Sequence, residues 1–124
     1  MTPVTVVLLG LAGGLGAGTR FVVDGLVRAW IRTALPIGTI LINVTGSFLL
    51  GLVVGTAAHG APADLLAIAG TGFLGGYTTF STASVETVRL IQARRPGLAV
   101  LNALGTLGAA LGAAALGVMI AGGF

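Results

Sequence analysis

The densest run of hydroxyl side chains in this sequence lies inside an otherwise apolar stretch. Two glycines come first, and the segment reads Gly75-Gly76-Tyr77-Thr78-Thr79-Phe80-Ser81-Thr82. In hydrocarbon an unpaired backbone polar group costs several kcal/mol, so a broken helix survives only inside protein or along a wet path. The segment therefore predicts a broken membrane helix with an ion pathway beside it.

Other neutral hydrogen-bond donors occur in the apolar stretches on both sides of this run. They are Asn43, Thr45, Ser47, Asn102 and Thr106. Neutral donors suit an anion that must lose its water yet still leave, because a fixed cation would hold the anion too tightly. The alternative is structural: these groups bond back to carbonyls one turn earlier or join helices together. For a single threonine the structural interpretation is favoured, whereas the density of hydroxyls in the third stretch favours a pathway.

Two further residues of the third apolar stretch could act on an ion. An aromatic ring is electron-poor at its edge, so Phe80 could contact an anion edge-on, or it could simply pack against lipid or a helix. Glu86 is the one acid deep in an apolar stretch. We expect it to pair with Arg89 at i,i+3, with a role at a pore mouth as the alternative. We expect Thr78, Thr82 and Glu86, spaced one turn apart, to lie on one helix face.

The composition describes a membrane protein. The chain has 124 residues, of which 56% are hydrophobic and 7% charged, and its mean hydropathy is +1.10. A soluble domain usually carries about a quarter charged residues. There is no cysteine, and we find neither a clustered basic face nor a Ser/His/Asp set or paired carboxylates. These observations argue against nucleic-acid binding and against an enzyme.

Four apolar segments predict an all-α membrane protein of one domain, residues 1–124. Each is near the ~20 residues needed to cross ~30 Å of hydrocarbon, and we place the spans at about 3–19, 36–58, 63–91 and 98–122. An amphipathic piece, 21–32, follows the first span and carries Asp24 and Arg28 at i,i+4. Small residues spaced four apart let helices approach closely. Such a thin bundle has little room for a pore, so a pathway needs a second subunit.

The arginines are distributed asymmetrically. With four spans, all of them fall on the side of the first and third loops: Arg20, Arg28, Arg32, Arg89, Arg94 and Arg95. We expect the chain to lie in the cell's inner (plasma) membrane. The positive-inside rule then places those loops in the cytoplasm and both termini on the outer side. A chain that inserts in both orientations should show little bias, so this sequence predicts one fixed orientation.

The motifs resemble those of the CrcB/Fluc fluoride channel family over essentially the whole chain. The matching residues are Gly13 to Ala17 with Arg20, then Gly38-Thr39 with Asn43 and Gly46-Ser47-Phe48, then Gly72 and Gly75 to Thr82 with Glu86. The resemblance implies an antiparallel dimer of four-helix subunits with two pores. It also implies passive export of fluoride that protects the cell from its toxicity.

The resemblance further implies roles for individual residues. Asn43 would be a pore donor and Phe80 a ring-edge contact, and the pore track would include Ser81, Thr82, Asn102 and Thr106. Arg20 would lie at the wide vestibule. A structural sodium ion at the dimer centre would be held by the main-chain carbonyls of Gly75 and Thr78.

The sequence departs from the family pattern at two positions. Ala83 stands where the family usually has a second phenylalanine, and Asn102 where it usually has a tyrosine. Together with the arginine bias, these changes favour pairing with an oppositely oriented homologous subunit over a homodimer. Two other functions remain as alternatives: a small proton-coupled exporter, which needs an acid in mid-span, and a non-conducting partner subunit.

Overall fold

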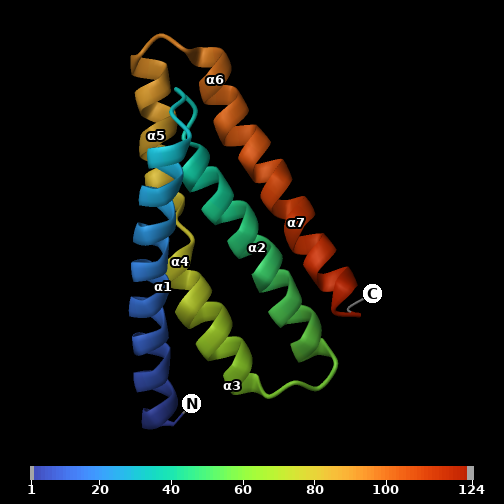
Figure 1. The fold of residues 1–124 in the computed structure, drawn as a ribbon. Helices are drawn as coiled ribbons and strands as arrows, with labels where there is room; N and C mark the ends of the chain where they lie inside the picture. The colour runs from blue at the N-terminus through green and yellow to red at the C-terminus, as the bar shows by residue number, and fades with distance from the viewer. Residues whose placement is uncertain (1, 123–124) are drawn as a thin grey trace.

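The computed structural model describes residues 2–122, and over this range the chain folds into four long helices joined by short loops (Figure 1). The first two are α1 (Pro3–Trp30) and α2 (Ile37–Ala58). The third is composed of α3 (Ala63–Leu65), η1 (Leu66–Leu74), α4 (Gly75–Tyr77) and, after a break, α5 (Phe80–Gln92). The fourth combines α6 (Pro96–Val100), η2 (Leu101–Gly105) and α7 (Thr106–Ile120).

Helix α1 is longer than the first predicted span. It begins at a capping Thr2, whose Oγ1 accepts the Thr5 N–H at 3.2 Å, and it runs without interruption to Trp30. The expected end near residue 19 is therefore not a helix end, because an arginine does not break a helix and no proline follows before Pro36. The predicted Asp24–Arg28 pair is confirmed, with 2.8 Å between Oδ2 and Nε.

The predicted break in the third helix is confirmed. Thr78 and Thr79 are extended, with ψ of 159° and 118°, between α4 and α5. The break corrects one expectation: Thr78 does not share a helix face with Thr82 and Glu86, because only the latter two belong to α5.

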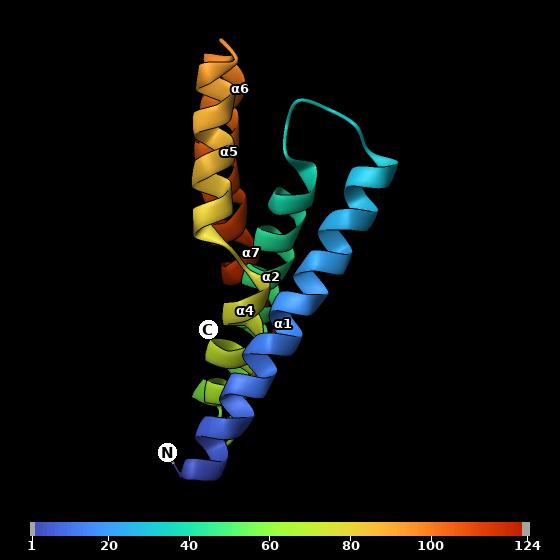
Figure 2. The same ribbon diagram turned by 90° about the vertical axis from the view of Figure 1, so that its left-hand side faces the viewer.

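Within residues 2–122, three helices are long and apolar enough to cross a membrane: Pro3–Trp30, Ile37–Ala58 and Pro96–Ile120. The broken third helix is divided into pieces that are each shorter, yet it runs alongside the others (Figures 1 and 2). The fourth helix starts two residues before the predicted 98 and ends two before the predicted 122. Four helices that repeatedly reverse direction fit the predicted four-span architecture.

Glycines set the packing between helices. A side chain at Gly16 or Gly76 would collide with the backbone of the neighbouring helix, at Phe73 and Gly13 respectively. Gly51 of α2 meets the Ala114 carbonyl of α7 in the same way. These close approaches are the expected means of packing apolar helices in lipid, where the hydrophobic effect cannot hold them together.

The two ends of the bundle differ. The α1–α2 loop and the α5–α6 turn lie at one end, whereas the N-terminus, the α2–α3 loop and the C-terminal end of α7 point towards the other (Figure 1). At this second end a ring nitrogen of His59 bonds the Gly122 carbonyl. The two arginine-bearing connections thus lie together, as the four-span topology requires.

Candidate functional site

One side chain from α2 satisfies the backbone of the helix break. The Asn43 Nδ2 donates to the Thr79 carbonyl at 2.9 Å, and the Thr79 N–H donates to Asn43 Oδ1 at 2.9 Å. A backbone group without a partner at this depth would cost several kcal/mol. Asn43 therefore satisfies both backbone groups of Thr79 and fixes where the helix breaks.

The Thr79 side chain starts the next helix. Its Oγ1 accepts the Thr82 N–H at 3.2 Å, the usual N-cap bond, and donates to Thr82 Oγ1 at 3.1 Å. The Ser81 hydroxyl lies 3.4 Å from the same Thr79 oxygen. The hydroxyl run thus caps α5 directly after the break.

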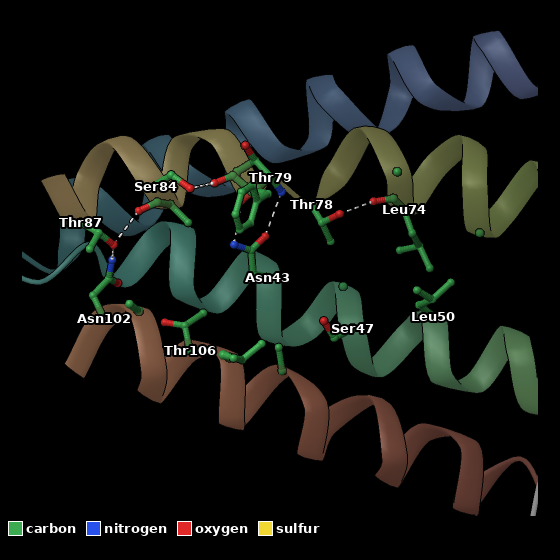
Figure 3. A pocket seen from close by; sticks show the side chains of 18 of the residues that line it. Asn43, Ser47, Leu50, Leu74, Thr78, Thr79, Ser84, Thr87, Asn102 and Thr106 are labelled. Carbon is green, nitrogen blue, oxygen red and sulfur yellow. Dashed lines mark hydrogen bonds between the residues drawn. The ribbon is translucent and has the colours of Figure 1, made fainter. Parts of the chain in front are cut away.

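An open groove of about 780 Å³ lies beside the break, and we call it the break groove. It runs between α2, the two halves of the third helix and the fourth helix (Figure 3). Its lining consists of Asn43, Gly46, Ser47, Leu50, Gly70, Thr71, Leu74, Gly75, Thr78, Thr79, Phe80, Ala83, Ser84, Thr87, Asn102, Ala103, Thr106, Leu107 and Ala110. None of these residues carries a charge.

The structure divides the predicted pore residues between two places. Four of them line the break groove: Asn43, Phe80, Asn102 and Thr106, as do both predicted sodium ligands, Gly75 and Thr78. The other two line a smaller cavity of about 290 Å³, whose residues are Ser81, Thr82, Arg28, Val85, Glu86 and Arg89. Arg20 lines neither cavity.

Some hydroxyl groups of the groove are already used by the protein. Thr78 donates to the Leu74 carbonyl at 2.9 Å, and Ser84 donates to the Phe80 carbonyl at 2.9 Å. Each bonds back one turn along its own helix, so the structural interpretation holds for these two. Their hydrogens are not available to a ligand.

Other donors in the groove keep a hydrogen free. Thr106 Oγ1 is buried and has no hydrogen-bond partner among residues 2–122. Asn43 uses one amide hydrogen on the Thr79 carbonyl, and Asn102 uses one on Thr87 Oγ1 at 2.8 Å. Since an amide carries two N–H groups, each asparagine has one more to offer.

Thr87 was not among the residues predicted from the sequence. Its hydroxyl donates to the Ala83 carbonyl at 2.8 Å and accepts from Asn102, which is 3% exposed. This chain of bonds fixes how the Asn102 amide is turned. The only sequence signal was the spacing of Thr87, four residues after Ala83 on the same helix face.

Ala83 and Asn102, the two positions that depart from the family pattern, line the same groove as the matching residue Phe80. Phe80 is 88% exposed, so its ring is not covered by its own chain. Ala83, also in the lining, contributes only a methyl group. The groove therefore has one aromatic wall and is otherwise bordered by small, hydroxyl, amide and aliphatic side chains.

The expected pairing of Glu86 with Arg89 is wrong. Arg28 Nη2 donates to Glu86 Oε2 at 3.0 Å, and Thr39 Oγ1 donates to Oε1 at 2.5 Å. Glu86 is only 8% exposed, and it faces α1 and α2 instead of the next turn of its own helix. Sequence spacing could not show this, because the partners are 58 and 47 residues away along the chain.

The sequence matches the family described as CrcB-like protein, Camphor Resistance (CrcB), over residues 7–118. It is 54% identical over 123 residues to the fluoride-specific ion channel FluC 1 of Leifsonia xyli subsp. xyli, covering 98% of this chain and 90% of that protein.

Two further relatives give the same result. FluC 2 of Cutibacterium acnes is 44% identical over 112 residues, covering 89% of this chain and 91% of that protein. FluC of Syntrophotalea carbinolica is 44% identical over 117 residues, covering 93% and 95%. A family match and relatives of this similarity extend along almost the whole chain, and they confirm the resemblance found in the motifs. The chain belongs to the CrcB-like family and is a multi-pass membrane protein.

Proposed function

We propose that this chain forms a fluoride-selective channel that lets fluoride leave the cell passively and so reduces its toxicity. The relatives named fluoride-specific ion channels support this function. The observation that carries it is the break groove, in which an aromatic ring and several free donors come together without any charge. A passive channel has no need of catalytic groups, so the proposal is also that the chain is not an enzyme.

The free donors explain how an anion could pass. A dehydrated fluoride ion needs N–H or O–H groups in place of water, and Asn43, Asn102 and Thr106 each have one hydrogen left. None of them holds a full positive charge, so the ion can leave again. Ser81 and Thr82 lie in the neighbouring small cavity, where the Arg89 side chain would attract anions, since Arg28 is already paired with Asp24 and Glu86.

A second subunit would close the groove. The groove is open along one side, and the exposed Phe80 ring has no cover from its own chain. We therefore propose an antiparallel dimer, in which the partner supplies the opposite wall. The arginine bias favours an oppositely oriented homologous subunit over a homodimer, with the α1–α2 and α5–α6 connections cytoplasmic and both termini outside.

The residues at the break fit the sodium ion that the resemblance implies. In a continuous helix the Thr79 N–H would bond the Gly75 carbonyl, and the Thr82 N–H would bond the Thr78 carbonyl. Here those two N–H groups donate to Asn43 Oδ1 and Thr79 Oγ1. We propose that the released carbonyls of Gly75 and Thr78 hold the ion, since a hard cation takes oxygen ligands.

The alternatives find less support. A proton-coupled exporter needs a carboxylate that can exchange protons in mid-span, yet the Glu86 carboxylate is bound by Arg28 and Thr39, and no acid lines the break groove. A non-conducting subunit would have no use for the free donors. A non-conducting subunit is the outcome to test, because Ala83 stands where the family usually has a second phenylalanine ring.

Fluoride efflux from liposomes tests the proposal. The purified chain is reconstituted in vesicles loaded with potassium fluoride, valinomycin clamps the voltage, and a fluoride electrode records release. We expect rapid efflux that excludes chloride and ignores a proton gradient, either from the chain alone or after co-reconstitution with an oppositely oriented homologue. Folded protein that is silent in both settings would reject the channel.

Paired variants locate the path within the groove. Thr106→Val removes a free hydroxyl at nearly constant volume, whereas Ser84→Ala removes a hydroxyl that is already bonded to the Phe80 carbonyl. We expect Thr106→Val to slow fluoride efflux by about threefold to tenfold, the value of roughly one hydrogen bond. Ser84→Ala should conduct like the parent chain. Efflux that is unchanged in Thr106→Val would remove this free donor from the pathway.

A further inference from the structure

A second polar cavity, of about 360 Å³, lies at the end of the bundle that carries the arginines. We call it the arginine cavity. Its lining residues come from the last turns of α1, from α5, from the loop that leads into α2 and from the α5–α6 turn. Its lining consists of Arg28, Ile31, Thr33, Ala34, Leu35, Pro36, Ile37, Gly38, Glu86, Arg89, Leu90, Ala93 and Arg95. It shares Arg28, Glu86 and Arg89 with the small cavity that contains Ser81 and Thr82, and it extends from there towards the α1–α2 loop.

Two of its three arginines have no acidic partner. Arg28 already serves both Asp24 and Glu86. Within residues 2–122, neither Arg89 nor Arg95 has a carboxylate within 4.0 Å. Both carboxylates near the cavity are thus engaged by Arg28, and two guanidinium groups remain for an outside ligand.

The chain turn after α5 brings these two arginines together. The Arg95 N–H donates to the Leu90 carbonyl at 2.9 Å, and the Arg94 N–H donates to Ile91 at 3.0 Å, which is the Schellman arrangement at a helix end. Arg94 occupies the left-handed position of this turn, with φ of 61°. The turn folds Arg95 back towards the end of α5, where Arg89 also lines the cavity.

The chemistry of the cavity selects a tetrahedral oxyanion with an apolar body. Guanidinium groups present paired N–H donors that match phosphate oxygens. The remaining wall is apolar, with Ile31, Leu35 and Leu90. Thr33 contributes no donor, because its hydroxyl is bonded to the Leu35 carbonyl. The Asp24 carboxylate lies against Gly38 at the start of α2.

The position of the cavity relative to the membrane restricts the choice of oxyanion further. Trp30, the last residue of α1 and the neighbour in sequence of the lining residue Ile31, is 86% exposed, as expected of an aromatic anchor at the membrane–water interface. We propose that the arginine cavity binds the phosphate headgroup of an anionic phospholipid, with Arg89 and Arg95 as its ligands and Leu35 and Leu90 against the glycerol. The site does not depend on fluoride conduction.

Native mass spectrometry of the purified full chain in detergent tests the proposal. The chain is titrated with phosphatidylglycerol and, separately, with phosphatidylcholine. We expect phosphatidylglycerol to bind more tightly, and Arg89→Gln/Arg95→Gln to weaken it by roughly 30-fold, at about fivefold for each arginine. Arg95→Gln alone, in an exposed turn, should weaken binding about fivefold and serves if the double variant fails to fold.

The matched control removes the same charge from outside the cavity. Arg32→Gln/Arg94→Gln changes two arginines of the same end that do not line it, and it should bind phosphatidylglycerol within about twofold of the parent chain. Equal losses in both double variants would show diffuse attraction and overturn the site. So would equal binding of the two lipids. Inorganic phosphate that binds as tightly as phosphatidylglycerol would assign the cavity to a free anion and overturn the lipid.

Discussion

The break groove and the arginine cavity lie on the same small bundle but use polar groups in opposite ways. The groove contains hydroxyls, amides and one exposed ring, and none of its lining residues is charged. The arginine cavity contains three arginines and one carboxylate. In the groove the donors are held by backbone carbonyls and by each other, whereas at the cavity the side chains are held by ion pairs or are exposed.

This difference follows from where each region lies. A charge in mid-membrane is costly and would trap an ion of opposite sign, so a passage there requires neutral donors. At the membrane surface, water and headgroups reduce the cost of charge, and arginines can remain without partners. We therefore expect the groove to depend on the positions of hydrogen bonds, and the arginine end to depend on charge.

Replacing Asn43 should have the largest effect. Asn43→Leu removes both bonds to Thr79 and leaves a backbone N–H and a carbonyl without partners. At about 1–3 kcal/mol for each of the two unsatisfied groups, we expect the free energy of unfolding to fall by roughly 2–6 kcal/mol. Unfolding in detergent micelles, followed by circular dichroism, measures the change.

Ser47→Ala is the matched control for Asn43. Ser47 lies one turn along the same helix and lines the same groove, but its hydroxyl makes no hydrogen bond among the described residues. Its removal should change stability by less than about 0.5 kcal/mol. If both variants were equally stable, the break would not depend on the Asn43 clamp.

The existence of the break could be predicted from the sequence, whereas its partners could not. Paired glycines followed by hydroxyl residues are a local signal, and Thr79 has the helix-capping side chain that such a break needs. The Glu86 pairing is different. Its neighbour Arg89 is one turn away, but the helix rotates Glu86 towards Arg28 and Thr39, and only the packing of three helices decides this.

The candidate site could likewise be predicted only in part from the sequence. Asn43 comes from α2, whereas Asn102 and Thr106 come from the fourth helix, yet their polarity in apolar stretches marked them, and the groove brings them together. Ser81 and Thr82 share that signal but lie in the smaller cavity, because consecutive residues of a helix point to different faces. Composition identifies polar residues of interest, and helix rotation decides which cavity they line.

Glycine packing provides the second test, on the side of the break that faces α1. A methyl group at Gly16 would meet the backbone of Phe73 and Tyr77, which lead into the break. Gly16→Ala should cost about 1–3 kcal/mol, since backbone atoms cannot move aside. Gly14→Ala, on the same helix with no atom within 4 Å, should be neutral or stabilising by up to about 1 kcal/mol. Similar melting temperatures for the two variants would contradict this packing.

The third test concerns the pair of Glu86 and Arg28 at the arginine end of the bundle. Glu86→Gln keeps the shape and the bond from Thr39 but removes the charge that faces Arg28. Because the Arg28 side chain is 53% exposed and keeps Asp24, we expect a loss of only about 1 kcal/mol. A double-mutant cycle with Arg28→Gln isolates the pair, and its coupling should shrink at high salt. Coupling that is independent of salt would mean that packing, not charge, holds Glu86.

Replacing Arg94 should have the smallest effect on stability. At this position the arginine end of the bundle is less stable than it would be with a glycine. The Arg94 φ of 61° lies in the left-handed region that favours glycine, and the Schellman turn usually has glycine at this position. Arg94→Gly should raise the free energy of unfolding by about 0.5–1 kcal/mol, while Arg94→Ala, which removes the same charge but keeps a Cβ, should not. The melting temperatures of the two variants in micelles measure the difference. If both variants gain equally, relief of charge repulsion among the arginines explains the gain; if only glycine gains, the strain belongs to the backbone of the turn that positions Arg95.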